Sequence, residues 1–177
     1  RMPLLLYGAR QVGKTYILTE FGETQFENMV YVNLETNLSV AAYFSDDISP
    51  ERLIRFLEAS VNEVITPGKT LIIFDEIQSC ERALTSLKYF CELAPEYHIA
   101  AAGSLLGVAI HRERYSFPVG KVESMTLYPL DFEEFLWANN ETLLAREIRH
   151  AYDAIDPLPE PLHQKAIEMY RYYLIVG

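Results

Sequence analysis

Five short apolar segments predict the β-strands of this chain. Four are almost continuously apolar, which is typical of strands buried on both faces, whereas the last one alternates. They cover residues 3–7, 29–34, 70–75, 98–102 and 121–127. Helical patterns lie between them, and strands that alternate with helices indicate crossover connections in a parallel sheet. The sequence therefore predicts an α/β fold, with helices on both sides of a mostly parallel sheet.

Three helices are expected between these strands. The first covers residues 16–21, and the second begins at Pro50 with Ser49 as its N-cap. The second helix should stop at Pro67–Gly68, and the third covers 81–93. Their expected apolar faces are Ile54, Leu57, Val61 and Val64 in the second helix, and Leu84, Leu87, Cys91 and Ala94 in the third.

The pattern becomes helical throughout near Pro129. Helical stretches are expected in 131–140, 143–152 and 163–175, and the prolines at 157, 159 and 161 should form a stiff break. We therefore expect a core over residues 1–128 and a helical appendage over 129–177. We expect this appendage to be the truncated start of a C-terminal domain.

The composition is that of an ordinary globular protein, with 50% apolar residues among 177. Mean hydropathy is +0.01. No apolar run approaches the ~20 residues that cross a bilayer, and the first residues lack the pattern of a signal peptide. We therefore expect a cytoplasmic protein without a membrane partner.

The net charge is −10 and the pI about 4.9. Nucleic-acid binding usually shows as a basic stripe, so this acidity argues against nucleic acid as a partner of this segment. Tyr170, Tyr172 and Tyr173 could stack bases, but their helical spacing is more typical of a packing face. Cys80 and Cys91 lack the spacing of a metal site and are expected to be reduced thiols.

A glycine-rich loop follows the first predicted strand. Gly8, Gly13, Lys14 and Thr15 fit the pattern G-x-x-x-x-G-K-[ST]. Its glycines let backbone N–H groups wrap a phosphate, the lysine reaches the terminal phosphates, and the threonine binds Mg²⁺. A chance match arises in roughly 1% of chains of this length. The predicted nucleotide-binding residues are Gly8, Ala9, Arg10, Gln11, Val12, Gly13, Lys14, Thr15 and Tyr16, with the role of Arg10 left open.

Two adjacent acids follow the third strand, in TLIIFDEIQ. Carboxylates at the tip of a buried strand are costly unless a cation lies nearby. We expect Asp75 to bind Mg²⁺ together with Thr15, and Glu76 to act as general base toward the attacking water. The alternative is that both acids cap the following helix.

Other users of nucleotides carry signatures that this chain lacks. It has neither the N-K-x-D guanine reader of GTPases nor an LSGGQ-like signature of transporter ATPases. Kinases with a phosphate loop often lack the second acid. ATP hydrolysis with Mg²⁺ is therefore the favoured activity, with ATP and ADP as the ligands.

Several motifs together resemble an AAA+ P-loop ATPase. More closely, the chain is similar to a prokaryotic family of uncharacterised ATPases that have an AAA+ core and a C-terminal domain of unknown function. The resemblance covers residues 3–136 and rests on GARQVGKT, YVNLE, LIIFDEIQ, AAGSLLGVA and LYPLDFEEFL. It implies a five-stranded parallel sheet in AAA+ order, with the nucleotide at the carboxyl ends of the strands.

The resemblance also implies two polar residues near the γ-phosphate. Ser104 would be a sensor at the end of the fourth strand, the alternative being a turn or helix-cap serine. Asn33 would orient Glu76, although a strand-end turn residue is an equally good interpretation.

Arginines are harder to assign. AAA+ rings bring an arginine finger from a neighbouring subunit, and Arg112 and Arg114 are candidates, although solvated loop charges are the simpler interpretation. Lys121 stands where the family often has arginine. Arg146 and Arg149 are candidates for a lid arginine without support from their spacing. The oligomeric state is left open.

The favoured function is ATP hydrolysis that drives a conformational change in an attached domain or an unknown protein partner. The alternative is a nucleotide-gated switch with little turnover. A DNA-processing motor would need a basic channel, which this acidic segment does not show.

Overall fold

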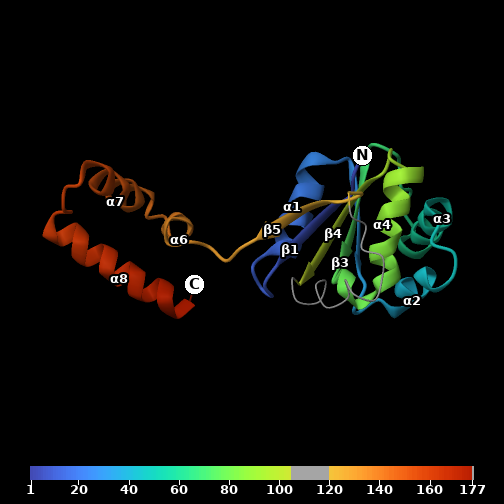
Figure 1. Cartoon of the computed structure of the whole chain (residues 1–177), viewed down its shortest axis with the longest axis horizontal. Helices are drawn as coiled ribbons and strands as arrows, with labels where there is room; N and C mark the ends of the chain where they lie inside the picture. The colour runs from blue at the N-terminus through green and yellow to red at the C-terminus, as the bar shows by residue number, and fades with distance from the viewer. Residues whose placement is uncertain (105–119, 177) are drawn as a thin grey trace. The chain divides into compact units, whose positions relative to one another are not determined.

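The computed structural model describes residues 1–104 and 120–176. The chain divides into two compact units, Arg1–Leu127 and Tyr128–Gly177. Figure 1 shows a sheet with its helices in the first unit and helices alone in the second. The assignment of the first unit as a nucleotide-binding core, and of the second as the start of a further domain, stays a prediction.

The first unit is built on a five-stranded sheet in the order β2-β3-β4-β1-β5. Every pairing between neighbouring strands is parallel. This confirms the predicted α/β class and the AAA+ strand order. The strands are β1 (Leu4–Gly8), β2 (Asn28–Asn33), β3 (Thr70–Asp75), β4 (His98–Ser104) and β5 (Glu123–Leu127).

Helices cover both faces of this sheet (Figure 1). On one face, Leu18 of α1 packs against Leu6 and Ile73. On the other face, Leu57 and Leu87 join a larger core. The helical segments are α1 (Lys14–Gln25), α2 (Leu38–Ala41), α3 (Pro50–Val61) and α4 (Glu81–Leu93), with 3₁₀ turns η1 (Ala42–Ser45) and η2 (Ile77–Ser79). Burial on both faces of β1, β3 and β4 explains why these three strands are almost continuously apolar in sequence.

The end of α3 differs from the prediction. The helix ends at Val61 because Asn62 adopts a left-handed conformation with φ 56°. The Glu58 carboxylate then accepts the Ile65 N–H at 2.8 Å, so the chain turns inward and buries Ile65 instead of Val64. The stop predicted at Pro67–Gly68 was therefore wrong.

The start of α3 agrees with the prediction, since Ser49 is its N-cap residue and Pro50 its first residue. The Ser49 side chain, however, makes no cap hydrogen bond to the helix. The Ser49 hydroxyl instead donates to Asp47 Oδ2 at 2.7 Å. The Asp47 carboxylate also accepts the Ser49 N–H, and these hydrogen bonds lower the pKa of that carboxyl.

The second unit contains α6 (Phe132–Ala138), α7 (Thr142–Ala154) and α8 (Glu160–Val176). Its buried core is small, with a cluster of Leu136, Leu144 and Ala145, and Phe135 is buried as well. Asp131 and Glu134 form a capping box that begins α6. Pro161 lies in the first turn of α8, where proline is tolerated, so the break ends before this residue. In the part of the chain that the structure describes, no helix has the length and apolar character to span a membrane.

Candidate nucleotide-binding site

The glycine-rich loop connects the end of β1 to the start of α1. Both glycines of the pattern answer a backbone requirement. A Cβ on Gly8 would lie 2.4 Å from the carbonyl oxygen of Leu127 in β5, so only glycine fits there. Gly13 has φ +93° with open space around it, so its constraint is conformational. The loop therefore lies close to the sheet edge at one end and turns sharply into α1 at the other.

The N-terminus of α1 is open toward the loop. No side chain of the described residues caps this helix. Its first N–H groups therefore remain available, together with the positive end of the helix dipole, for an anion. Lys14 is only 8% exposed, and its ammonium donates to the carbonyl oxygens of Gly8 at 3.2 Å and Ala9 at 2.6 Å. An ammonium has three donors, so one remains for a phosphate oxygen.

Asp75 ends β3 and lies against the start of α1, as the sequence predicted. The residue is 3% exposed. Asp75 Oδ2 accepts the hydroxyl of Thr15 at 2.7 Å and that of Tyr31 at 2.8 Å, while Oδ1 accepts the Glu76 N–H at 2.9 Å. These three donors fix the orientation of the carboxylate.

The donor set fits Mg²⁺. Two adjacent ligands of an octahedral Mg²⁺ with bonds of ~2.1 Å lie about 3 Å apart, close to the separation of Thr15 Oγ1 and Asp75 Oδ2. Mg²⁺ usually takes one or two protein oxygens and completes its shell with phosphate and water. Thr15 and Asp75 are therefore suited to hold it beside a phosphate.

Tyr31 was not predicted as a site residue. It lies on β2, whose register places Asn33 opposite Asp75. Partial burial and the hydrogen bond to Asp75 raise the pKa of Tyr31 to about 12. Its place in the YVNLE motif is the signal that could have drawn attention to it.

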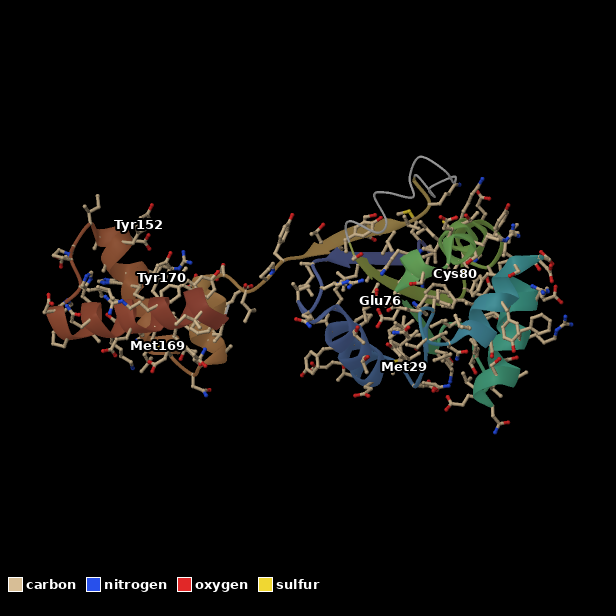
Figure 2. The ribbon with its side chains drawn as sticks, turned by 90° about the horizontal axis from the view of Figure 1, so that it is seen from below. Met29, Glu76, Cys80, Tyr152, Met169 and Tyr170 are labelled. Carbon is tan, nitrogen blue, oxygen red and sulfur yellow. The ribbon has the colours of Figure 1, made fainter. Side chains whose placement is uncertain are left out.

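Glu76 follows β3 in a left-handed conformation with φ 51°. Figure 2 marks its position beside the end of the strand. Its Oε2 accepts the side-chain amide of Gln78, and Gln78 Oε1 accepts the Ser104 N–H at 3.3 Å. The structure thus brings together both predicted catalytic residues, Glu76 and Ser104, through a glutamine that the prediction missed.

The remaining loop residues line a cleft of about 500 Å³. Glu35, also missed by the prediction, lines it as well. The cleft residues are Arg10, Gln11, Gly13, Lys14, Thr15, Tyr16, Glu35 and Glu76.

Asn33 Oδ1 accepts the N–H groups of Glu35 and Thr36, both at 3.0 Å, which is the pattern of a strand-end turn residue. Val12 Cγ2 lies 3.0 Å from the position that a Cβ on Gly8 would take.

The candidate finger and lid arginines fall in different parts of the chain. Arg112 and Arg114 lie outside the described residues. Lys121 forms an ion pair with Glu92 at 3.1 Å. Arg146 and Arg149 pair with Glu147 and Glu133 inside the second unit.

The aromatic residues of the second unit pack on one another. Tyr170 and Tyr173 contact Phe132, and Tyr172 contacts Phe135. Tyr170, on α8, is marked in Figure 2. These contacts agree with the interpretation of the three tyrosines as a packing face.

Cys80 and Cys91 are free thiols, and burial raises the pKa of Cys80.

Comparison with known proteins supports a nucleotide-binding AAA domain. The family model described as "AAA domain" matches residues 1–136. No protein of curated function matches the chain significantly. Two solved structures of the Aeropyrum pernix ORC2 protein are similar. Its ADPNP–ADP form has a TM-score of 0.50 at 14% identity, covering 94% of this chain and 61% of that one. Its ADP form has a TM-score of 0.47 at 15% identity, covering 94% and 62%.

This chain thus spans about three fifths of the length of ORC2, and the likeness concerns the fold. Family membership supports the binding of a nucleotide. The matched region includes the glycine-rich loop and all five strands, and it ends within α6. With its phosphate loop and this strand order, the chain belongs to the AAA domain family of P-loop proteins.

Proposed function

We propose that this chain binds ATP and ADP with Mg²⁺ and hydrolyses ATP. The observation that carries the proposal is the hydrogen bond of 2.7 Å between Thr15 and Asp75. It joins the phosphate loop to the acid at the end of β3, directly beside Glu76. A metal-binding pair next to a second carboxylate is an arrangement suited to phosphoryl transfer to water.

The phosphates would be held by the loop and by α1. The open N-terminus of α1 offers N–H groups to the phosphate oxygens, and Lys14 offers its remaining donor. Thr15 and Asp75 would hold Mg²⁺, which neutralises charge on the phosphates when bound. Tyr31 and the Glu76 N–H keep the Asp75 carboxylate in place for this role.

Glu76 is proposed as the general base. Its carboxylate takes a proton from a water molecule as the water oxygen attacks the γ-phosphorus and the bond to the ADP oxygen breaks. Ser104, at the end of the neighbouring strand β4, is proposed as the polar residue that responds to the γ-phosphate. The loss of γ-phosphate contacts on hydrolysis would change the conformation of an attached domain or of a protein partner.

Adenine nucleotides are the proposed ligands because the sequence lacks a guanine reader. The similar ORC2 structure with a TM-score of 0.50 is that of ADPNP–ADP complexes, which agrees with this choice. We also propose that the chain is located in the cytoplasm and has a protein partner.

The proposal is tested by calorimetric titration of the chain with ATP and ADP, combined with phosphate release in Mg²⁺ and in excess EDTA. Adenine nucleotides should bind, and phosphate release should require Mg²⁺. Binding of neither nucleotide would contradict the proposal as a whole.

A nucleotide-gated switch is the second candidate. It is favoured by the lack of an assigned arginine finger, because the two candidates, Arg112 and Arg114, lie outside the described residues. In this case ATP and ADP bind, but turnover stays far below ~1 s⁻¹, against an enzyme median of about 10 s⁻¹.

A further inference from the structure

Gln78 connects the ends of two neighbouring strands across the candidate site. Its side-chain amide donates to Glu76 Oε2, and its carbonyl oxygen accepts the Ser104 N–H at 3.3 Å. We propose that Gln78 is a positioning residue that holds the Glu76 carboxylate for attack by water. This inference rests on the proposed hydrolysis of ATP and adds a residue to it.

The chemistry of the partners determines which way the amide points. An ionised carboxylate can only accept hydrogen bonds, and a backbone N–H can only donate. Gln78 must therefore direct its NH₂ to Glu76 and its oxygen to Ser104. No other residue of the same size offers one donor and one acceptor at this distance. Glutamate would face Glu76 with a second acceptor, and methionine would keep the shape but lose both hydrogen bonds.

The backbone places Gln78 for this contact. Glu76 has φ 51° and ψ 45°, which turns the chain sharply after β3 and starts the 3₁₀ turn η2. Ile77 is 0% exposed and anchors that turn in the core, between the two polar residues. A left-handed non-glycine residue is uncommon and costs energy, so the surrounding contacts must maintain it. The bridge to Ser104 supplies one of them, because β3 and β4 are adjacent in the sheet.

The contact restricts the freedom of the Glu76 side chain. The bond to Gln78 uses Oε2, so Oε1 is left to accept a proton. A base that is already oriented loses less freedom when the water approaches, which speeds the chemical step without changing how tightly the nucleotide binds. Loss of Gln78 should therefore lower kcat and leave KM unchanged.

The test is a double-mutant cycle on this chain. Steady-state ATP turnover is measured for the wild type, Gln78→Met, Gln78→Glu, Glu76→Gln and the pair Gln78→Met with Glu76→Gln. Gln78→Met should lower kcat about tenfold, a part of the ~10²–10⁴ that a general base supplies, with KM changed less than about twofold. Gln78→Glu should lower kcat at least as much. In the Glu76→Gln background, Gln78→Met should have no further effect.

A merely structural role gives a different result. In that case Gln78→Met lowers kcat by the same factor in both backgrounds, or changes KM instead, and either outcome overturns the inference. Gln25→Met is the matched control, because Gln25 is exposed in the same unit and lies outside the cleft. Its turnover should equal that of the wild type.

Unfolding by urea separates this inference from the proposed function. The stabilities of Gln78→Met, Glu76→Ala and the double variant need no turnover. If the bridge exists, the double variant loses less stability than the sum of the two single losses. Absence of turnover in the wild type overturns ATP hydrolysis and the positioning role of Gln78 together, whereas additive stability losses overturn the bridge alone.

Discussion

The hydroxyl of Thr15 donates to Asp75 Oδ2 at 2.7 Å, although the two residues lie 60 positions apart in the chain. Thr15 is in the first turn of α1, and Asp75 is the last residue of β3. The contact therefore ties the phosphate loop to the sheet. It also places two hard oxygen atoms side by side, which is the basis of the Mg²⁺ site proposed for this chain.

Thr15→Val should reduce the benefit that Mg²⁺ gives to nucleotide binding. The variant keeps the shape of the side chain but loses its oxygen, so ATP affinity in Mg²⁺ should fall about tenfold, or ~1.4 kcal/mol. Affinity in EDTA should be unchanged. Calorimetry with and without Mg²⁺ measures both values. Thr15→Ser, which retains the hydroxyl, is the control and should behave like the wild type. An equal loss in EDTA would show that Thr15 does not act through the metal.

Lys14→Ala should weaken nucleotide binding about 100-fold. Hydrogen bonds to charged groups contribute ~1.5–3 kcal/mol each, and Lys14 is the buried cation of the cleft. Titration with a fluorescent ADP analogue measures the change. Lys69→Ala is a matched control, because Lys69 pairs with Glu27 away from the cleft. Similar affinities for the two variants would contradict the assigned role of Lys14.

Tyr31→Phe should destabilise the fold by about 1 kcal/mol at pH 7. A hydrogen bond to a charged group contributes more than this when buried, but Tyr31 is 38% exposed. The pKa of Tyr31 is raised from 10.0 to about 12 in the folded state. Its contribution is therefore complete below pH 10 and is lost as the pH rises toward 12.

Urea unfolding at pH values from about 7 to 11 tests this linkage. The difference in unfolding free energy between the wild type and Tyr31→Phe should narrow above pH 10. The control Tyr152→Phe removes an exposed hydroxyl and should show no such change. A difference that stays constant through the whole range would mean that Tyr31 ionises as it does in the unfolded chain.

The two glycines of the loop should respond differently to alanine. Gly8→Ala places a Cβ 2.4 Å from the Leu127 carbonyl oxygen and should destabilise the fold by about 3 kcal/mol. Gly13→Ala meets no atom within 4 Å and costs only its conformation at φ +93°, about 1–2 kcal/mol. Thermal or urea unfolding of the two variants measures which of them loses more stability. Equal losses would show that β5 yields to the added methyl group.

Much of the site could be predicted from the sequence because its signals are local. The phosphate loop lies within one strand, turn and helix, and Asp75 and Glu76 follow a continuous apolar run. Both segments end parallel strands, and such ends meet at one edge of a sheet. That rule alone brings Thr15 close to Asp75.

Tyr31 and Gln78 could not be predicted in the same way. The contact of Tyr31 depends on the register between β2 and β3, which periodicity does not determine. The contact of Gln78 depends on the left-handed turn at Glu76, a conformation that glutamate rarely adopts. The early end of α3 has a similar cause, since Asn62 takes a left-handed conformation where the apolar pattern continued to Val64.

The most direct test of the account compares ATP binding and turnover by the wild type and Glu76→Gln in Mg²⁺. Because Glu76 is proposed to take the proton of the attacking water, the variant should bind ATP like the wild type and lose at least ~100-fold in kcat. Wild-type turnover that is unchanged in Glu76→Gln would contradict the assignment of Glu76 as the base of an ATPase.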